Sequence, residues 1–257
     1  MHSAASALRA AIEQLLLPAE CLLCHELLLG SDTPRLTCAV CRQRWRAVRP
    51  PWCERCGQPE PHFGPCRLCR EWPAALTSAR SAVWLAEGGR EVVHALKYGG
   101  LPRIAGDMAL AMTRLCPAAV ESSALVPIPL APQRLKQRGY NQSEALADAL
   151  GKLWKVPVLT NLLVRTRETS TQTTLTPETR LANVAGAFGL RIDDCGLRIR
   201  NLPVKSAIRN PQFTIVLVDD VFTTGATLAE AARALEQSGA TRILGVTFAR
   251  AAIPDFS

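Results

Sequence analysis

The sequence predicts an α/β protein with a Rossmann-like, mainly parallel sheet, preceded by a small cysteine-rich module. Near the C-terminus, an apolar run at residues 215–218, a helical stripe and a second apolar run at residues 243–248 indicate strand, helix and strand. Near the N-terminus, eight of the ten cysteines form four Cys-x-x-Cys pairs. A chain of 257 residues has room for one ordinary α/β domain and one such appendage.

The paired cysteines have the spacing of metal ligands. Two thiolates separated by two residues can bind one tetrahedral ion, and two such pairs complete a zinc site with bonds of ~2.3 Å. The pairs are Cys21 and Cys24, Cys38 and Cys41, Cys53 and Cys56, and Cys66 and Cys69. Pairing in chain order predicts two zinc ribbons, while a cross-braced arrangement stays open. A redox role would explain one pair but not four, so we expect one or two structural zinc ions.

Arginines and tryptophans are interleaved between and after these cysteines. They are Arg35, Arg42, Arg44, Arg46, Arg49, Arg55, Arg67 and Arg70 with Trp45, Trp52 and Trp72. Such a pattern can bind a nucleic-acid single strand by stacking and charge neutralisation. Because Glu54, Glu60 and Glu71 dilute the charge, we favour the alternative in which the tryptophans fill the thin core of a small ribbon.

Composition and charge bear on where the protein acts. No apolar run approaches the roughly 18 residues of a membrane span, so we expect no membrane insertion. Residues 1–20 predict an amphipathic helix in an unexported, cytoplasmic protein, because Glu13 interrupts the apolar part and no small-residue cleavage site follows it. The formal charge of +8 favours anionic partners, whether nucleotides or nucleic acid, without selecting among them.

Strand and helix signals alternate after the last cysteine pair. We therefore expect an N-terminal helix and double ribbon at residues 1–75 and an α/β domain at residues 76–257. The pattern predicts a strand, a short helix, a longer helix and a strand, at residues 78–87, 90–100, 104–115 and 125–128. A proline-stiffened loop with three cations follows, and a further helix has an apolar stripe of Leu146, Ala149, Leu150 and Leu153.

Polar residues follow the buried strand at residues 215–218. Residues 223–227 offer successive backbone N–H groups, three hydroxyls and a helix N-terminus, which favour a phosphate monoester. Asp219 and Asp220 would repel phosphate, but their carboxylates accept hydrogen bonds from sugar hydroxyls or from a hydrated magnesium ion. The combination predicts a ribose 5-phosphate site. The alternative, in which these residues only cap the helix, explains less, because a helix cap needs only one such side chain.

The stretch VLVDDVFTTGAT resembles the phosphoribosyl pyrophosphate (PRPP) signature of type I phosphoribosyltransferases. The resemblance implies that fold for the α/β domain, and a site for PRPP with magnesium. The implied PRPP-binding residues are Asp219, Asp220, Val221, Phe222, Thr223, Thr224, Gly225, Ala226 and Thr227. The cysteine pairs and the motifs HALKYGG, VPIPL and RGYNQ are similar to those of the competence protein F (ComF) family.

The ComF resemblance implies two further parts of the site. A strand-end loop with Pro127, Ile128, Pro129, Arg134 and Arg138 would hold pyrophosphate. A polar, threonine-rich segment would close over the ligand as a flexible lid, with Arg165, Arg167, Gln172, Arg180 and Asn183. For the matching residues Gly139, Tyr140, Asn141 and Gln142, a binding role stays open beside a structural one, a helix entry capped by Asn141 or Ser143. The stretch at residues 189–212 exceeds the family's usual length and predicts an extra hairpin or loop.

The ComF resemblance also implies a link to DNA uptake or to the use of internalised DNA. As an enzyme, the protein would transfer ribose phosphate from PRPP to a base or amine, with catalytic residues and acceptor unassigned. As a DNA-handling factor, it would bind single-stranded DNA, act with DNA-uptake or recombination proteins, and use a transferase-like pocket without turnover. As a regulator, it would sense PRPP.

Overall fold

The structure is a computed structural model and describes residues 19–28, 35–59, 66–118, 120–167, 185–191, 198–199 and 202–252. Most of the helix expected at residues 1–20 lies outside this part, as do Gln172, Arg180 and Asn183. Among the described residues, no helix is both long enough and apolar enough to cross a membrane.

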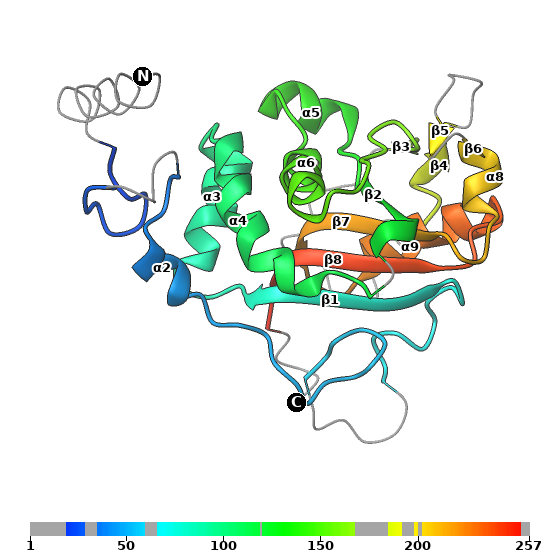
Figure 1. Ribbon diagram of the computed structural model, residues 1–257, viewed down its shortest axis with the longest axis horizontal. Helices are drawn as coiled ribbons and strands as arrows, with labels where there is room; N and C mark the ends of the chain where they lie inside the picture. Colours follow the sequence, from blue (N-terminus) through cyan, green and yellow to red (C-terminus); the bar gives the residue numbers. More distant parts are fainter. Residues whose placement is uncertain are drawn as a thin grey trace, which may run out of the picture.

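A four-stranded parallel sheet organises the chain (Figure 1). Its strands are β1 (Leu76–Trp84), β2 (Ser123–Pro127), β7 (Thr214–Phe222) and β8 (Ile243–Arg250), in the order β1-β8-β7-β2. Each neighbouring pair is parallel, so the carboxyl ends of all four strands lie at one edge of the sheet. The predicted α/β fold with a parallel sheet is confirmed.

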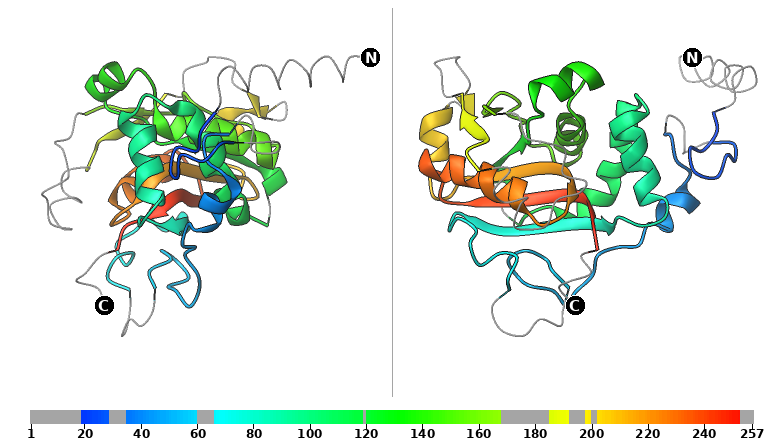
Figure 2. Two further views of the ribbon diagram at one scale, coloured as in Figure 1. Left: turned by 90° about the vertical axis from the view of Figure 1, so that its left-hand side faces the viewer. Right: turned by 180° about the vertical axis from the view of Figure 1, so that it is seen from behind.

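Three helices cover one face of the sheet: α3 (Gly89–Tyr98), α4 (Ala105–Met112) and α6 (Gln142–Trp154) (Figures 1 and 2). The longer helix expected at residues 104–115 is instead α4 between two 3₁₀ turns, η2 (Pro102–Ile104) and η3 (Thr113–Leu115). The predicted stripe of α6 is wrong at its end, because Leu153 is 43% exposed and Trp154 only 8%. Burial of the larger indole removes more apolar surface from water.

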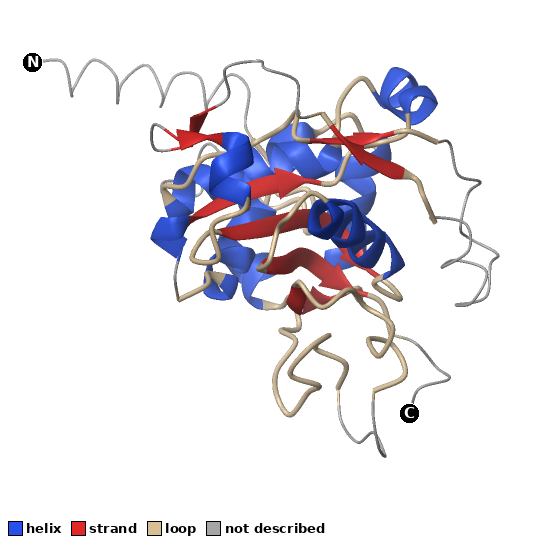
Figure 3. Cartoon of the chain, turned by 90° about the vertical axis from the view of Figure 1, so that its right-hand side faces the viewer, coloured by secondary structure: helices blue, strands red, loops and turns tan. Residues whose placement is uncertain are grey.

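The opposite face is covered by α9 (Ala226–Gln237), which connects β7 to β8 (Figure 3). The predicted strand, helix and strand are therefore confirmed. Gly225, with a φ of 78°, precedes the helix, and Gly239, with a φ of 101°, follows it. Beside α9 lies an antiparallel pair of strands, β3 (Leu163–Arg165) and β4 (Phe188–Leu190).

Two connections differ in detail from the expected loops. A short turn, η4 (Val120–Ser122), leads into β2, and the cationic loop after β2 contains a helix, α5 (Pro132–Arg138). Pro132 pre-sets the backbone of its first turn, and Gly139, with a φ of 80°, ends it. The long stretch before β7 contains the predicted extra hairpin, β5 (Arg198–Ile199) with β6 (Leu202–Pro203), followed by α8 (Val204–Ile208).

Two tryptophans of the N-terminal module, Trp45 and Trp72, pack against the sheet and not in a core of the ribbons alone, whereas Trp52 is partly exposed. Trp45 and Trp72 are each 6% exposed. The Trp45 ring meets Phe248 of β8 edge-on at a centroid distance of 5.2 Å, and the Trp72 ring lies 6.2 Å from that of Phe222 in β7. The prediction that these rings fill a core is confirmed. The core is not that of a ribbon alone, however, because residues of the sheet belong to it.

Asp107 of α4 fixes the first ribbon to the α/β fold. Its buried carboxylate accepts hydrogen bonds from the backbone N–H of Leu36 (3.0 Å) and of Thr37 (2.8 Å), and from the Thr37 hydroxyl (2.8 Å). Arg35 forms an ion pair with the same carboxyl group at 3.5 Å. The segment that leads into the short helix α2 (Ala39–Gln43) is thereby held against α4.

Candidate functional site

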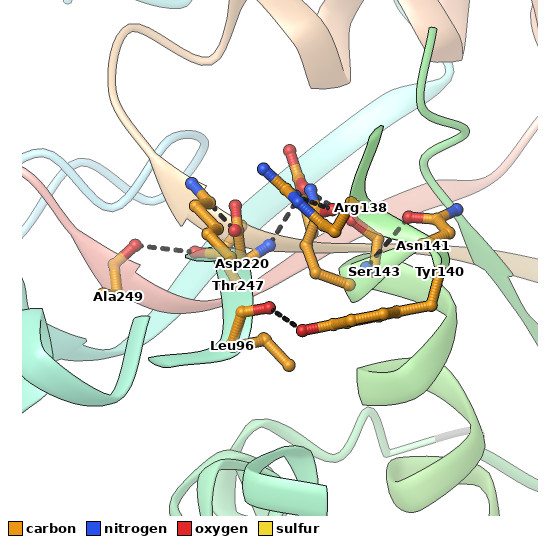
Figure 4. A network of polar contacts seen from close by, with 11 residues as sticks. Leu96, Arg138, Tyr140, Asn141, Ser143, Asp220, Thr247 and Ala249 are labelled. Atoms are coloured by element: carbon orange, nitrogen blue, oxygen red, sulfur yellow. Dashed lines mark hydrogen bonds and ion pairs between the residues drawn. The ribbon is translucent and has the colours of Figure 1, made fainter. Parts of the chain in front are cut away.

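Asp219 and Asp220 lie in the last part of β7, at the carboxyl edge of the sheet. The Asp219 carboxylate accepts hydrogen bonds from the Ser143 hydroxyl at 2.8 Å and from the Asp220 backbone N–H at 2.9 Å. Asn141 caps α6 by accepting from the Ser143 backbone N–H at 3.1 Å (Figure 4). The start of α6 thus orients the first acid, which confirms the helix-cap role considered for Asn141.

Lys97, near the end of α3, pairs with the second acid. Its ammonium group lies 2.8 Å from Oδ2 of Asp220, and both side chains are largely buried. Burial alone would lower the pKa of Lys97, but the charge and hydrogen bond of Asp220 outweigh it and raise that pKa. Tyr140 ties the same helix to α6, because its hydroxyl donates to the Leu96 carbonyl (Figure 4).

The two carboxyl groups are electrostatically unequal. Burial raises the pKa of Asp219 to about 7, and the negative charge of Asp220 adds to this effect. Lys97 and the hydrogen bond from Ser143 oppose the shift. One acid is therefore held as an ion pair, while the other titrates near neutrality and can either donate or accept a hydrogen bond.

The loop between β7 and α9 has a backbone that only glycine fits. Gly225 adopts a φ of +78°, and a Cβ there would lie 2.5 Å from Cζ2 of Trp72 and 2.8 Å from Cζ of Phe222. The Thr224 hydroxyl accepts from the Ala226 N–H at 3.4 Å. Gly225 itself offers no side chain to cap α9, so beyond this Ala226 contact the helix N-terminus can still donate backbone N–H groups to an anionic ligand.

The residues of the signature stretch divide into a part buried in the core and a part that is partly exposed in the loop. Val221 and Phe222 belong to β7 and pair with Ala249 and Arg250 of β8. The Phe222 ring is buried, so it supports the loop from within the core. Thr223 and Thr227 are partly exposed and lie on either side of Gly225.

The loop after β2 lies beside the acids, because β2 and β7 are neighbours. The Ile128 backbone N–H donates to the Val218 carbonyl at 3.0 Å, and its own carbonyl accepts from the Asn141 amide at 3.0 Å. Pro127 and Ile128 are therefore committed to the sheet and to α6. Pro129 is partly exposed and follows them at the edge.

Arg165 lies within the electrostatic influence of Asp219 and of arginines from other positions. Burial lowers the pKa of Arg165, the positive charges of Arg134 and Arg167 lower it further, and Asp219 opposes them. Arg134 belongs to α5, whereas Arg165 ends β3. The structure thus brings together cations of the predicted pyrophosphate loop and of the predicted lid. Arg138, by contrast, contacts Gln142 and lies over the exposed Tyr98 ring, at 5.4 Å from its centroid.

The eight paired cysteines form two clusters in chain order. Cys21, Cys24, Cys38 and Cys41 form the first and Cys53, Cys56, Cys66 and Cys69 the second, with the sulfurs of each cluster within 4.8 Å of one another. Sulfur pairs lie 3.8 Å apart in the first cluster, and 3.7 and 3.5 Å apart in the second. Tetrahedral zinc with bonds of ~2.3 Å places sulfurs about 3.8 Å apart, so both clusters fit a structural zinc ion.

The second cluster belongs to the same core as the sheet. Cys56 and Cys69 are buried with Ile215 and Leu217 of β7. Arg250, which is 1% exposed, donates to the Cys56 carbonyl at 2.9 Å and to the Gln58 side chain at 2.8 Å. Its guanidinium group also lies 4.2 Å from the centroid of the Phe222 ring. This arginine connects the cluster to the strand that carries the acid pair.

Sequence reasoning missed several members of this site. Lys97 lies within the quoted motif HALKYGG, but no charge partner for it is visible in the sequence. Ser143 was considered only as a cap, and its hydroxyl instead orients Asp219. Trp72 and Arg250 act through contacts with Phe222, which no spacing rule predicts.

The fold and the two cysteine clusters define a zinc-ribbon α/β protein. The double zinc ribbon domain family matches residues 12–70. The chain is 30% identical over 213 residues to the DNA utilization protein YhgH of Escherichia coli (strain K12), covering 80% of this chain and 86% of that protein. The chain belongs to the ComF/YhgH family, whose members are named as DNA utilization and competence proteins.

Two more relatives extend this similarity. Competence protein F of Haemophilus influenzae is 34% identical over 128 residues, which is 50% of this chain and 50% of that protein. Competence protein ComFC of Bacillus subtilis is 25% identical over 213 residues, which is 79% of this chain and 78% of that protein.

Proposed function

We propose that the edge of the sheet between β7 and β2 binds PRPP or a related ribose phosphate, with magnesium. The observation that carries this proposal is the unequal acid pair beside a helix N-terminus whose N-cap residue, Gly225, has no capping side chain. The loop at residues 223–227 would hold the 5-phosphate through backbone N–H groups and threonine hydroxyls. Asp219 and Asp220 would accept hydrogen bonds from the vicinal ribose hydroxyls.

The pyrophosphate end of PRPP would lie toward the cations. The positive charge of Arg134 lowers the pKa of Arg165, and a bound anion would stabilise both of these like charges. Magnesium would enter with the ligand and neutralise part of its charge. Gln172, Arg180 and Asn183 stay predicted lid residues. Whether ribose is transferred can be followed as pyrophosphate release with candidate bases and amines.

Titration calorimetry with PRPP and magnesium tests the proposal. The zinc-loaded wild type is expected to bind, and Asp219→Asn/Asp220→Asn is expected to show no measurable heat, because the amides accept poorly from the hydroxyls. Asp219→Asn alone keeps the Lys97 pair with Asp220 and serves as the milder variant. Absence of binding to a folded wild type holding its zinc would refute a ribose phosphate site and favour the DNA-handling alternative.

The pKa of Asp219 predicts a pH dependence of that binding. Because the pKa is about 7, the ionised fraction of this carboxyl group rises about tenfold between pH 6 and pH 8. If ionised Asp219 accepts from the ribose hydroxyls, PRPP affinity rises over the same range. The phosphates of PRPP also titrate in this range, so the pH dependence of affinity is compared with that of Asp219→Asn. In this variant, the titration of PRPP still affects the affinity but that of residue 219 does not. Equal pH slopes in both proteins would contradict the role of Asp219.

The relatives' names connect this site with DNA. We propose that the protein acts in the cytoplasm in the use of internalised DNA, with single-stranded DNA and DNA-uptake or recombination proteins as partners. Cysteine thiolates persist in such a reducing compartment, which fits the two clusters.

A further inference from the structure

A groove rich in arginine lies between the first zinc ribbon and the edge of the sheet formed by β1. It has a volume of about 1050 Å³. Its charged lining residues are Arg42, Arg44, Arg46, Arg49, Arg114 and Glu87. They come from α2 and the chain after it, from the 3₁₀ turn η3 that follows α4, and from the turn after β1. The left view of Figure 2 faces the side of the molecule on which α2 lies.

The walls of this groove are fixed by contacts between distant segments. The chain after α2 follows β1, because the Val48 N–H donates to the Ala82 carbonyl at 3.2 Å and the Trp84 N–H donates to the Arg46 carbonyl at 2.8 Å. The other wall is α4, to which Asp107 holds the ribbon. The groove is therefore formed before any ligand arrives.

Cations outnumber acids among the residues that line the groove. Among the described residues that line it, five are arginines and one, Glu87, is an acid. Burial lowers the pKa of Arg114, and the positive charge of Arg49 lowers it further, so these two guanidinium groups repel each other. An anion bound between them would remove that repulsion.

We propose that this arginine groove binds the phosphodiester backbone of a single nucleic-acid strand. One guanidinium group can donate two parallel hydrogen bonds to the oxygens of a phosphate. Several guanidinium groups along a groove therefore suit the successive phosphates of a strand better than one small anion. Trp45 is buried against Phe248, so it does not present a ring for base stacking. Binding is therefore independent of base sequence and depends on salt.

The groove is separate from the ribose phosphate site and does not depend on that proposal. It adjoins β1, whereas the acid pair belongs to β7, and β8 lies between these two strands. A strand in the groove and a ribose phosphate at the acid pair can therefore be bound at the same time.

Fluorescence anisotropy with a labelled oligothymidylate tests the groove in the full-length, zinc-loaded protein. Arg49→Glu/Arg114→Glu is expected to weaken binding at low salt by at least about tenfold. With Arg49→Ala/Arg114→Ala, the slope of log affinity against log salt becomes shallower by about 1.4, the value for two lost phosphate contacts. The alanine variant also gives a valid result if the glutamate variant does not fold.

Arg209→Glu/Arg242→Glu is the matched control, because both residues are exposed and are not among the groove's lining residues; Arg209 follows α8, and Arg242 directly precedes β8. It is expected to bind the strand like wild type, and the groove variants are expected to bind PRPP like wild type. An equal loss in the control would overturn the proposal in favour of general surface charge. Loss of strand binding in Asp219→Asn, or competition by pyrophosphate as strong as by the oligonucleotide, would also overturn it.

Discussion

Replacement of Cys56 by serine is expected to unfold the α/β sheet as well as the second ribbon. Cys56 is fully buried in the core that contains Ile215 and Leu217, and its carbonyl accepts from Arg250. Structural zinc sites contribute about 10 kcal/mol or more of apparent binding free energy, which is comparable to the whole stability of a typical domain of about 5–15 kcal/mol. The variant should therefore lose its cooperative thermal transition.

Cys24→Ser in the first cluster is the matched comparison, because Cys24 is exposed. Its loss is expected to release the first ribbon and to leave the sheet folded. Circular dichroism melts and zinc content of both variants measure the difference. A folded Cys56→Ser protein with an unchanged melting temperature would show that the sheet does not need the second zinc ion.

Gly225→Ala is expected to abolish ligand binding at the loop between β7 and α9. A φ of +78° costs a residue with a Cβ about 1–2 kcal/mol, and the clash with Trp72 and Phe222 adds about 1–3 kcal/mol of overpacking. The rings cannot yield easily, because Arg250 and the second cluster lie behind them. The loop must therefore move, and the N–H groups that would face the phosphate move with it.

Gly100→Ala separates strain from steric clash. Gly100 has a φ of +64°, but a Cβ there would meet nothing within 4 Å. This variant is expected to lose only about 1–2 kcal/mol of stability and to keep PRPP binding. Chemical denaturation and PRPP calorimetry measure both effects. If Gly225→Ala binds PRPP as well as Gly100→Ala does, the loop does not hold the phosphate.

Local pattern explains which parts of the fold the sequence predicted. The length of the apolar run at residues 215–218 indicates a buried strand, and the period of the apolar stripe in α9 indicates a helix. The prediction for the end of α6 was wrong because periodicity does not show whether Leu153 or Trp154 is the buried residue. Packing against the core decides this. The helix α5 was missed because its seven residues have no buried side chain and hence no apolar stripe.

The candidate site was predictable where its residues are adjacent in the chain. Asp219, Asp220 and Gly225 form one contiguous motif, and the eight cysteines are recognisable by spacing. Lys97 and Ser143 come from other elements and meet the acids only through the sheet topology. Their roles depend on distances of less than 3 Å across the fold, which a linear pattern does not contain.

The pairing of β1 with β8 has a consequence for folding during synthesis. β1 ends at Trp84, and its partner β8 ends at Arg250, so the sheet cannot be completed until almost the whole described chain has left the ribosome. Such non-local pairing slows folding and leaves apolar surface exposed for longer. The cysteine clusters are synthesised first, and Arg250, which supports the second of them, is among the last of the described residues to emerge. Until then, metal binding is the local source of order for the nascent N-terminal module.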